Sequence, residues 1–166
     1  MILNTISYKA NISYLLGMFA LLLIWACGEG FDFEKKQTIG NKGWAYSDVL
    51  DFDLNIADTT TIYNIYLEIE HATDYSKQNL YTLIHTKFPS GERLKEQVSL
   101  ELADKRGKWN GNCSSSSCTL RIPIQEGAFF SQAGQYTFSV EQYMRQNPLA
   151  GIKSIALMLE DTQQKR

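Results

Sequence analysis

The chain has 166 residues, and its 16 basic side chains are nearly balanced by 18 acidic ones. A single domain is the default expectation for this length, and the absence of any Lys/Arg-rich block gives no reason to expect nucleic acid as a partner. A hydrophobic content of 44% with only 3 prolines is typical of a chain that buries a real core, and excludes disordered, collagenous and bundle-type membrane classes.

The N-terminus is typical of a lipoprotein signal peptide. Lys9 gives a weakly positive start, and the apolar run at 12–26 is shorter than the roughly 20 residues that span a bilayer comfortably. The run ends in Ile24-Trp25-Ala26-Cys27-Gly28, which resembles the lipobox of an aliphatic, a variable and a small residue followed by Cys. We therefore expect lipidation of Cys27; the alternative is a plain secreted or single-span protein with an incidental Cys27.

Polarity rises directly after Cys27, as expected for a tether that leads to a folded domain. The predicted organisation is a signal peptide at 1–26, a lipid-anchored tether at 27–42 and a folded domain at 43–166. More than one acyl chain gives stable anchoring. The expected location is therefore the cell envelope, anchored to a membrane on the periplasmic side or in the outer membrane.

Alternation of apolar and polar residues with period two predicts strands along the first half of the domain. The clearest is Leu50 to Ile56, followed by 61–71 and 80–88, where Pro89-Ser90-Gly91 signals a turn. The spacing of apolar residues at 94–102 predicts a fourth strand that contains a bulge.

A loop with Gly107, Trp109 and Gly111 comes next, and then Cys113 and Cys118 bracket four serines. With Cys27 lipidated, an even pair remains in an oxidising compartment, so a structural disulfide is expected. It would close a short loop, stabilise it by about 2 kcal/mol and stiffen a hairpin tip. A metal site needs more ligands, and a C-x-x-C redox motif has two intervening residues.

The second half predicts a short strand at 119–124, a helical turn within 125–132, and strands at 135–144 and 152–160. No segment shows an amphipathic helical period of ten or more residues. We predict an all-β antiparallel β-sandwich of about 7–8 strands, with immunoglobulin-like and jelly-roll topologies both open.

The sequence contains no recognisable catalytic motif. The chain has 2 histidines, His71 and His85, which exclude a His-rich metal site, and no Gly-x-Ser-x-Gly or phosphate-binding loop is present. Glu68, Glu70 and Glu141 could serve a glycosidase only by residue type. We therefore predict no catalytic residues, no metal and no cofactor.

Aromatic side chains are the most informative candidates for binding. Tyr66, Tyr81 and Tyr143 fall on strand faces opposite the predicted core, and Trp44 and Trp109 lie near strand ends or in loops. Such side chains stack on sugar rings or anchor a protein partner; packing between strands is the alternative.

Several short motifs together resemble the gliding-motility lipoprotein GldH family of Bacteroidetes. Besides the lipobox and Trp44, they are Asn79-Leu80-Tyr81, Leu102-Ala103-Asp104 running into Gly107-Lys108-Trp109-x-Gly111, Tyr143-Met144-Arg145, and Pro148-Leu149-x-Gly151-Ile152. The resemblance spans nearly all of the mature chain. The segment from Cys113 to Cys118 departs from the pattern, in which a Gly-rich link is expected.

The resemblance implies a non-enzymatic envelope lipoprotein of the gliding motility and secretion machinery, whose partners are other envelope proteins. Trp109, Tyr143, Arg145 and Tyr81 are the candidates for a partner or ligand surface. The alternative hypothesis is a carbohydrate-binding lipoprotein of an outer-membrane glycan-uptake system, which the exposed aromatics motivate.

Overall fold

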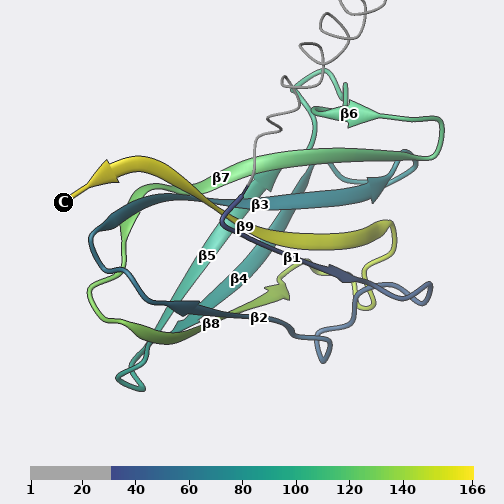
Figure 1. Cartoon of the computed structure of the whole chain (residues 1–166). Helices are drawn as coiled ribbons and strands as arrows, with labels where there is room; N and C mark the ends of the chain where they lie inside the picture. The colour runs from purple at the N-terminus through teal and green to yellow at the C-terminus, as the bar shows by residue number, and fades with distance from the viewer. Residues whose placement is uncertain (1–30) are drawn as a thin grey trace, which may run out of the picture. The chain divides into compact units, whose positions relative to one another are not determined.

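Residues 31–166, the part of the chain that the computed structural model describes, form strands, turns and loops without a helix (Figure 1), which confirms the all-β prediction. The lipobox and Cys27 lie outside the described residues. The strands are β1 (Phe33–Thr38), β2 (Leu50–Ile56), β3 (Thr61–Ala72), β4 (Asn79–Lys87), β5 (Arg93–Glu101), β6 (Asn112–Cys113), β7 (Ser117–Phe129), β8 (Gly134–Gln142) and β9 (Ile152–Lys165).

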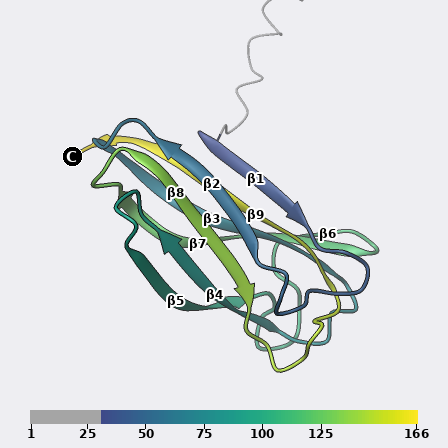
Figure 2. The same ribbon diagram turned by 90° about the horizontal axis from the view of Figure 1, so that it is seen from below.

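Two antiparallel sheets make up the sandwich, in the orders β1-β9-β3-β7-β6 and β2-β8-β4-β5 (Figures 1 and 2). The pairing is nested: β1 pairs with β9, β2 with β8, β3 with β7, and β4 with β5. Apart from the two-residue β6, this is the strand order of a jelly roll, in which a folded-over antiparallel ribbon is wrapped into two sheets. The pairing thus decides between the two topologies that the sequence leaves open.

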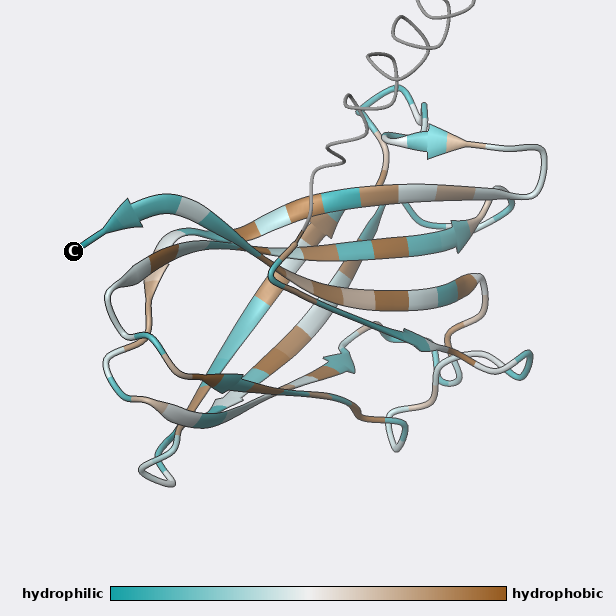
Figure 3. Cartoon of the chain, in the orientation of Figure 1, coloured by the Kyte–Doolittle hydropathy of each residue, from teal (hydrophilic) through white to brown (hydrophobic). Residues whose placement is uncertain are grey.

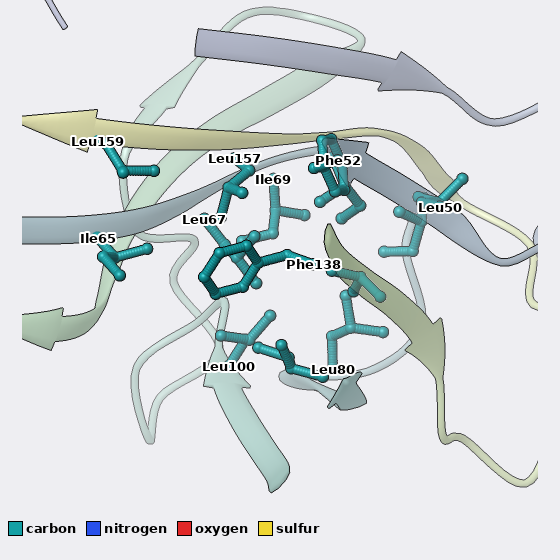
Figure 4. Close-up of a cluster of buried hydrophobic side chains, with 14 of the residues drawn as sticks. Leu50, Phe52, Ile65, Leu67, Ile69, Leu80, Leu100, Phe138, Leu157 and Leu159 are labelled. Atoms are coloured by element: carbon teal, nitrogen blue, oxygen red, sulfur yellow. The ribbon is translucent and has the colours of Figure 1, made fainter. Parts of the chain in front are cut away.

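The alternation of side chains along each strand builds the core. In β2, Leu50, Phe52, Leu54 and Ile56 are buried while the residues between them are exposed, because successive side chains point to opposite faces of a sheet. Figure 3 shows the same banding of apolar and polar residues on other strands. Figure 4 shows Phe138 among leucine and isoleucine side chains from both sheets.

β1 lies within the segment 27–42, which the sequence assigns to a tether. Its six residues pair in unbroken register with β9, from Phe33 opposite Leu159 to Thr38 opposite Ser154, so the sheet begins inside the segment 27–42. The strand Phe-Glu-Lys-Lys-Gln-Thr has one apolar residue and shows no hydrophobic alternation. It forms through backbone pairing at a sheet edge, which leaves no periodic pattern in the sequence.

The predicted helical turn at 125–132 is wrong, because β7 continues as a strand to Phe129. Tyr66 pairs with Pro123, Ile65 with Gln125 and Tyr63 with Ala128, so β7 carries an extra residue at each of two β-bulges, the second of which lies between Gln125 and Ala128. Gly127 takes a positive φ of 64° there, and its N–H donates to Asn64 Oδ1 at 3.1 Å. These extra residues interrupt the period of two, so the alternation typical of a strand is lost from the sequence of this segment.

The bulge predicted in the fourth strand is also absent. β5 pairs with β4 in continuous register from Arg93 to Glu101. Leu94, Glu96, Val98 and Leu100 therefore share one face, and Leu94 remains 46% exposed. The edge strand leaves this end of its inner face open to solvent, so a charged Glu96 is tolerated there and no bulge is needed.

The Leu67 side chain tests the core. It is 0% exposed and lies in the cluster between the sheets. We expect Leu67→Ala to lower the free energy of unfolding by about 2–5 kcal/mol, since it removes apolar contacts and leaves a cavity. Leu94→Ala, on the exposed edge strand, should change it by less than about 0.5 kcal/mol. Urea denaturation measures both, and equal losses would contradict this assignment of the core.

Candidate functional site: the outer face of the four-stranded sheet

The register of the sheet β2-β8-β4-β5 determines which side chains point away from the core. On β4, Leu80, Thr82 and Ile84 are buried. The residues that alternate with them, Tyr81, Leu83 and His85, therefore face outward. Cross-strand pairing then aligns outward residues in rows, such as Asp51, Ser139, His85 and Lys95. This outer face carries polar, charged and aromatic groups side by side.

Two hollows lie on this face. The larger, which we call the tyrosine hollow, has a volume of about 1000 Å³, and the second, the charged hollow, about 570 Å³. Glu141 on β8 lines both, so the two are adjacent on one surface. The charged hollow is lined by Val49, Asp51, Asp53, His85, Lys87, Arg93, Thr137, Ser139 and Glu141.

Half of the twelve residues that line the tyrosine hollow are apolar or aromatic. These six are Tyr46, Tyr81, Leu83, Tyr143, Met144 and Leu149. The polar half consists of Lys77, Gln97, Glu141, Gln142, Arg145 and Gln146. A concave site with apolar walls and a few polar groups is the usual form of a binding site.

Exposed hydrophobic side chains gather on the same face. Of the six large hydrophobic residues exposed in the described part of the chain, Tyr46, Tyr81 and Tyr143 line the tyrosine hollow and Val49 lines the charged hollow. Tyr143 is the most exposed of these four, at 53%. Exposed apolar groups that cluster in a depression mark an interaction surface rather than random exposure.

A buried glutamine holds the loop that carries Tyr143 and Arg145. Gln142 is 2% exposed; its Nε2 donates to the Gln146 carbonyl at 3.1 Å, and its Oε1 accepts from the Met144 N–H at 2.8 Å. The Tyr143 N–H donates to the Tyr81 carbonyl at 2.8 Å. These bonds fix the backbone from which the exposed Tyr143 projects.

Trp44 closes the same loop from the other side. It exchanges backbone hydrogen bonds with Leu149 at 2.8 and 2.9 Å, and its indole Nε1 donates to the Asp48 carbonyl at 2.7 Å. The preceding Gly43 has a φ of 88°, and a Cβ there would lie 2.7 Å from the Leu149 carbonyl oxygen. Trp44 is 0% exposed, so it is a structural residue beneath the hollow.

Tyr46 completes the rim. Its hydroxyl donates to the Met144 carbonyl at 2.5 Å, and its N–H donates to Asn147 Oδ1 at 2.9 Å. The tyrosine is therefore tied to the loop that carries Tyr143 even though its ring is 46% exposed. No sequence signal marks Tyr46, Lys77 or Gln142 as a site residue. Tyr46 and Lys77 lie in loops without periodicity, and Gln142 has the pattern of an ordinary polar strand residue.

Trp109 is turned into the protein. Its indole Nε1 donates to the Thr73 carbonyl at 3.1 Å, and its ring packs on His71 with centroids 4.5 Å apart. It lines neither hollow. Of the four predicted surface residues, the structure brings Tyr81, Tyr143 and Arg145 together in the tyrosine hollow and places Trp109 elsewhere.

His71 is 0% exposed, and its Nδ1 lies 2.9 Å from the Ala72 carbonyl oxygen, so Nδ1 carries the hydrogen. Burial lowers the pKa of His71, the charge of Lys153 acts in the same direction, and the bond to Ala72 opposes them. The imidazole is therefore neutral at pH 7 and serves as part of the aromatic packing around Trp109.

The outer face of the other sheet satisfies its own polar groups. Lys36 pairs with Glu70 at 3.0 Å and Arg121 with Glu68 at 3.4 Å. The Tyr66 hydroxyl donates to Glu160 at 2.8 Å. Hydrogen bonds lower the pKa values of Glu70, from Lys36 foremost, and of Glu160, from Tyr66 foremost. The hydroxyl of Tyr66, an aromatic residue that the sequence places outward, thus has its hydrogen-bond partner within the domain.

The acidic candidates for catalysis do not converge. Glu68 and Glu70 lie on the outer face of the five-stranded sheet, whereas Glu141 lies on the outer face of the other sheet, with Oε1 3.2 Å from His85 Nε2. That pair is close enough to attract but is not aligned as a hydrogen bond. Within residues 31–166 no group of three His, Cys, Asp or Glu side chains is placed to hold a metal ion.

Cys113 and Cys118 are joined by a disulfide with an S–S distance of 2.00 Å. They lie opposite each other in the ladder between β6 and β7, so the bridge closes a hairpin at the edge of the five-stranded sheet. The hairpin thus belongs to the sheet that does not carry the hollows.

The match to known proteins covers the same folded part of the chain. The family model described as GldH lipoprotein matches residues 32–159. This chain belongs to the GldH lipoprotein family. The family match begins within the described domain and includes every residue of the tyrosine hollow.

Two curated relatives carry the family name. A gliding motility lipoprotein GldH homolog from Christiangramia forsetii is 23% identical over 92% of this chain and 97% of its own length. The gliding motility lipoprotein GldH of Flavobacterium johnsoniae is 23% identical over 86% of this chain and 92% of its own. Both alignments cover most of this chain and most of the relative.

Solved structures add little. An uncharacterized protein from Listeria monocytogenes EGD-e aligns with 80% of this chain and 11% of its own at 15% identity, with a TM-score of 0.40. At that score the overlap supports no argument. Among the described residues no helix is long and apolar enough to cross a bilayer.

Replacing Gln142 tests the anchoring of the loop. Gln142→Met leaves the Met144 N–H and the Gln146 carbonyl without their partner, so the free energy of unfolding should fall by about 1–3 kcal/mol. Gln146→Met is the matched control, because the Gln146 side chain is exposed and should change stability by less than about 0.5 kcal/mol. Equal values in denaturant titrations would show that Gln142 does not hold the loop.

The pH dependence of stability tests His71. Its folded pKa lies below the ordinary value of about 6.5, so the unfolded chain takes up a proton first. Stability contributed by the neutral form is complete above about pH 6.5 and is lost as the pH falls below it. Thermal unfolding between pH 7.5 and 5.5 should show this loss in the wild type and in His85→Gln. His71→Phe should reduce it, and an unchanged profile in that variant would refute the assignment.

Proposed function

We propose that this protein is a non-enzymatic, lipid-anchored component of the gliding motility machinery that acts through contacts with other envelope proteins. Membership of the GldH lipoprotein family and the names of its two relatives support the motility role. The single structural observation behind the contact mechanism is the gathering of exposed Tyr46, Tyr81 and Tyr143 in one hollow. The family assignment gives no support to the glycan-uptake alternative.

The proposal includes removal of the signal peptide at 1–26 and a lipid on Cys27. Cys27 precedes Phe33, the first residue of β1, by six positions. An extended chain spans at most about 3.6 Å per residue, so the sheet edge would lie within roughly 20 Å of the anchored residue. On this proposal the tether ends at β1, and its short length keeps the domain close to the lipid anchor.

The rigidity of the site supports a binding role. Several loops and strands meet at the tyrosine hollow, and hydrogen bonds from Gln142, Tyr46 and Trp44 hold them together. A surface that is ordered before binding loses little conformational freedom when a partner docks. The arrangement suits a stable contact within an assembly.

Deletion and anchor variants test the proposal in a source strain that glides. Deletion should abolish gliding and surface spreading, and the wild-type gene should restore both. Cys27→Ser should lose palmitate labelling, leave the membrane fraction and fail to restore movement. Cys113→Ser/Cys118→Ser is the matched control, which should keep the label. Intact gliding, spreading and protein secretion in the deletion strain would refute the role.

A further inference from the structure

The tyrosine hollow carries positive charge that the protein leaves unneutralised. Within residues 31–166, neither Lys77 nor Arg145 takes part in an ion pair. Both are exposed side chains on the lining of the hollow. One acid, Glu141, also lines the hollow, so the basic side chains outnumber the acidic ones by two to one. A chain with more acidic than basic residues thus concentrates two free cations beside three exposed tyrosines.

The two cations come from different loops that structure holds in place. Tyr75 lies two residues before Lys77 and is 5% exposed, and its hydroxyl donates to the Asn79 carbonyl at 3.1 Å. Arg145 follows Met144, whose N–H and carbonyl are bonded by Gln142 and Tyr46. The backbones that carry the charges are therefore fixed, while both side chains reach into solvent. Such an arrangement attracts anionic groups and sets the spacing at which they bind.

The lining of the hollow also offers apolar surface. Leu83, Met144 and Leu149 contribute to it together with the tyrosine rings. An anionic ligand for this hollow must also bury apolar surface, because exposed hydrophobic groups gain most from removal of water. Acidic protein segments with interspersed apolar residues meet both requirements. An acidic glycan offers the charge and a ring face but has little to place against leucine and methionine.

We propose that the tyrosine hollow binds an extended acidic segment of a partner protein, with carboxylates at Lys77 and Arg145 and apolar side chains among Tyr46, Tyr81 and Tyr143. This deepens the proposed function, on which it rests, by naming the contact site and the chemistry of the partner. The neighbouring charged hollow is nearly balanced between Asp51 and Asp53 on one side and Lys87 and Arg93 on the other, so it does not compete for the acidic segment.

Photocrosslinking of the full-length protein in its own cells tests the site. A photoreactive p-benzoylphenylalanine is placed at Tyr143 or, as a second position, at Tyr81. Mass spectrometry of the crosslinked peptide should identify a segment rich in Asp and Glu. The same probe at Phe129, which is 55% exposed but lines neither hollow, should not capture that segment.

Charge reversal provides the decisive comparison. Lys77→Glu/Arg145→Glu should lower the yield of the crosslink at least tenfold. Lys105→Glu/Lys108→Glu is the matched control: it makes the same change of charge at exposed lysines that line neither hollow, and should leave the yield unchanged. The crosslinked segment, made as a synthetic peptide, should bind the purified protein with a Kd that rises with NaCl concentration.

Several outcomes would overturn the proposal. They are capture of a polysaccharide, of a second copy of this chain or of a segment without acids, and an unchanged yield after charge reversal. The absence of any crosslink at both tyrosines, with the protein at normal abundance, would overturn it too. If deletion abolishes gliding while crosslinking fails, the site is wrong and the role stands. If the acidic segment is captured but deletion leaves gliding intact, the motility role is wrong and the site stands.

Discussion

The register of the nested antiparallel ladders is the constraint on which the rest of the domain depends. A shift of one residue would move every side chain of a strand to the opposite face. In this register, the leucine, isoleucine and phenylalanine residues of eight strands meet in one core. The same register turns Tyr81, Leu83 and His85 outward on β4. The composition of the outer face that carries both hollows is thus a consequence of how the core is buried.

The two outer faces of the sandwich differ in how many of their polar side chains have partners within the same face. On the five-stranded sheet, side chains such as Lys36, Glu70 and Glu160 find partners within the face. On the four-stranded sheet, both hollows, four of the six exposed large hydrophobic residues and two unpaired cations lie together. Individual surface ion pairs contribute little to stability, so the contrast matters for recognition more than for folding. It indicates which face is available to a partner.

The loop from Tyr143 to Leu149 shows why the family motifs lie where they do. Trp44 and Leu149 are far apart in the chain but form a bridge, and the buried Gln142 donates a hydrogen bond to the Trp44 carbonyl. These residues support the loop, whereas Tyr143 and Arg145 project from it. Trp109 also supports the fold, because its ring packs on the buried His71. Buried supporting residues and exposed residues therefore lie close together within the same short motifs.

The sequence by itself determined the all-β class, most strands, the family and three of the residues in the tyrosine hollow, since period-two alternation and short motifs are local patterns. It did not determine the jelly-roll order, β1 or the continuation of β7, because pairing between distant strands and a bulge leave no local periodicity. Only the tertiary structure placed Tyr46 and Lys77 beside Tyr81 and Arg145. Those side chains come from separate loops and strands, and they reach one surface only through strand pairing and the hydrogen bonds that hold the loops.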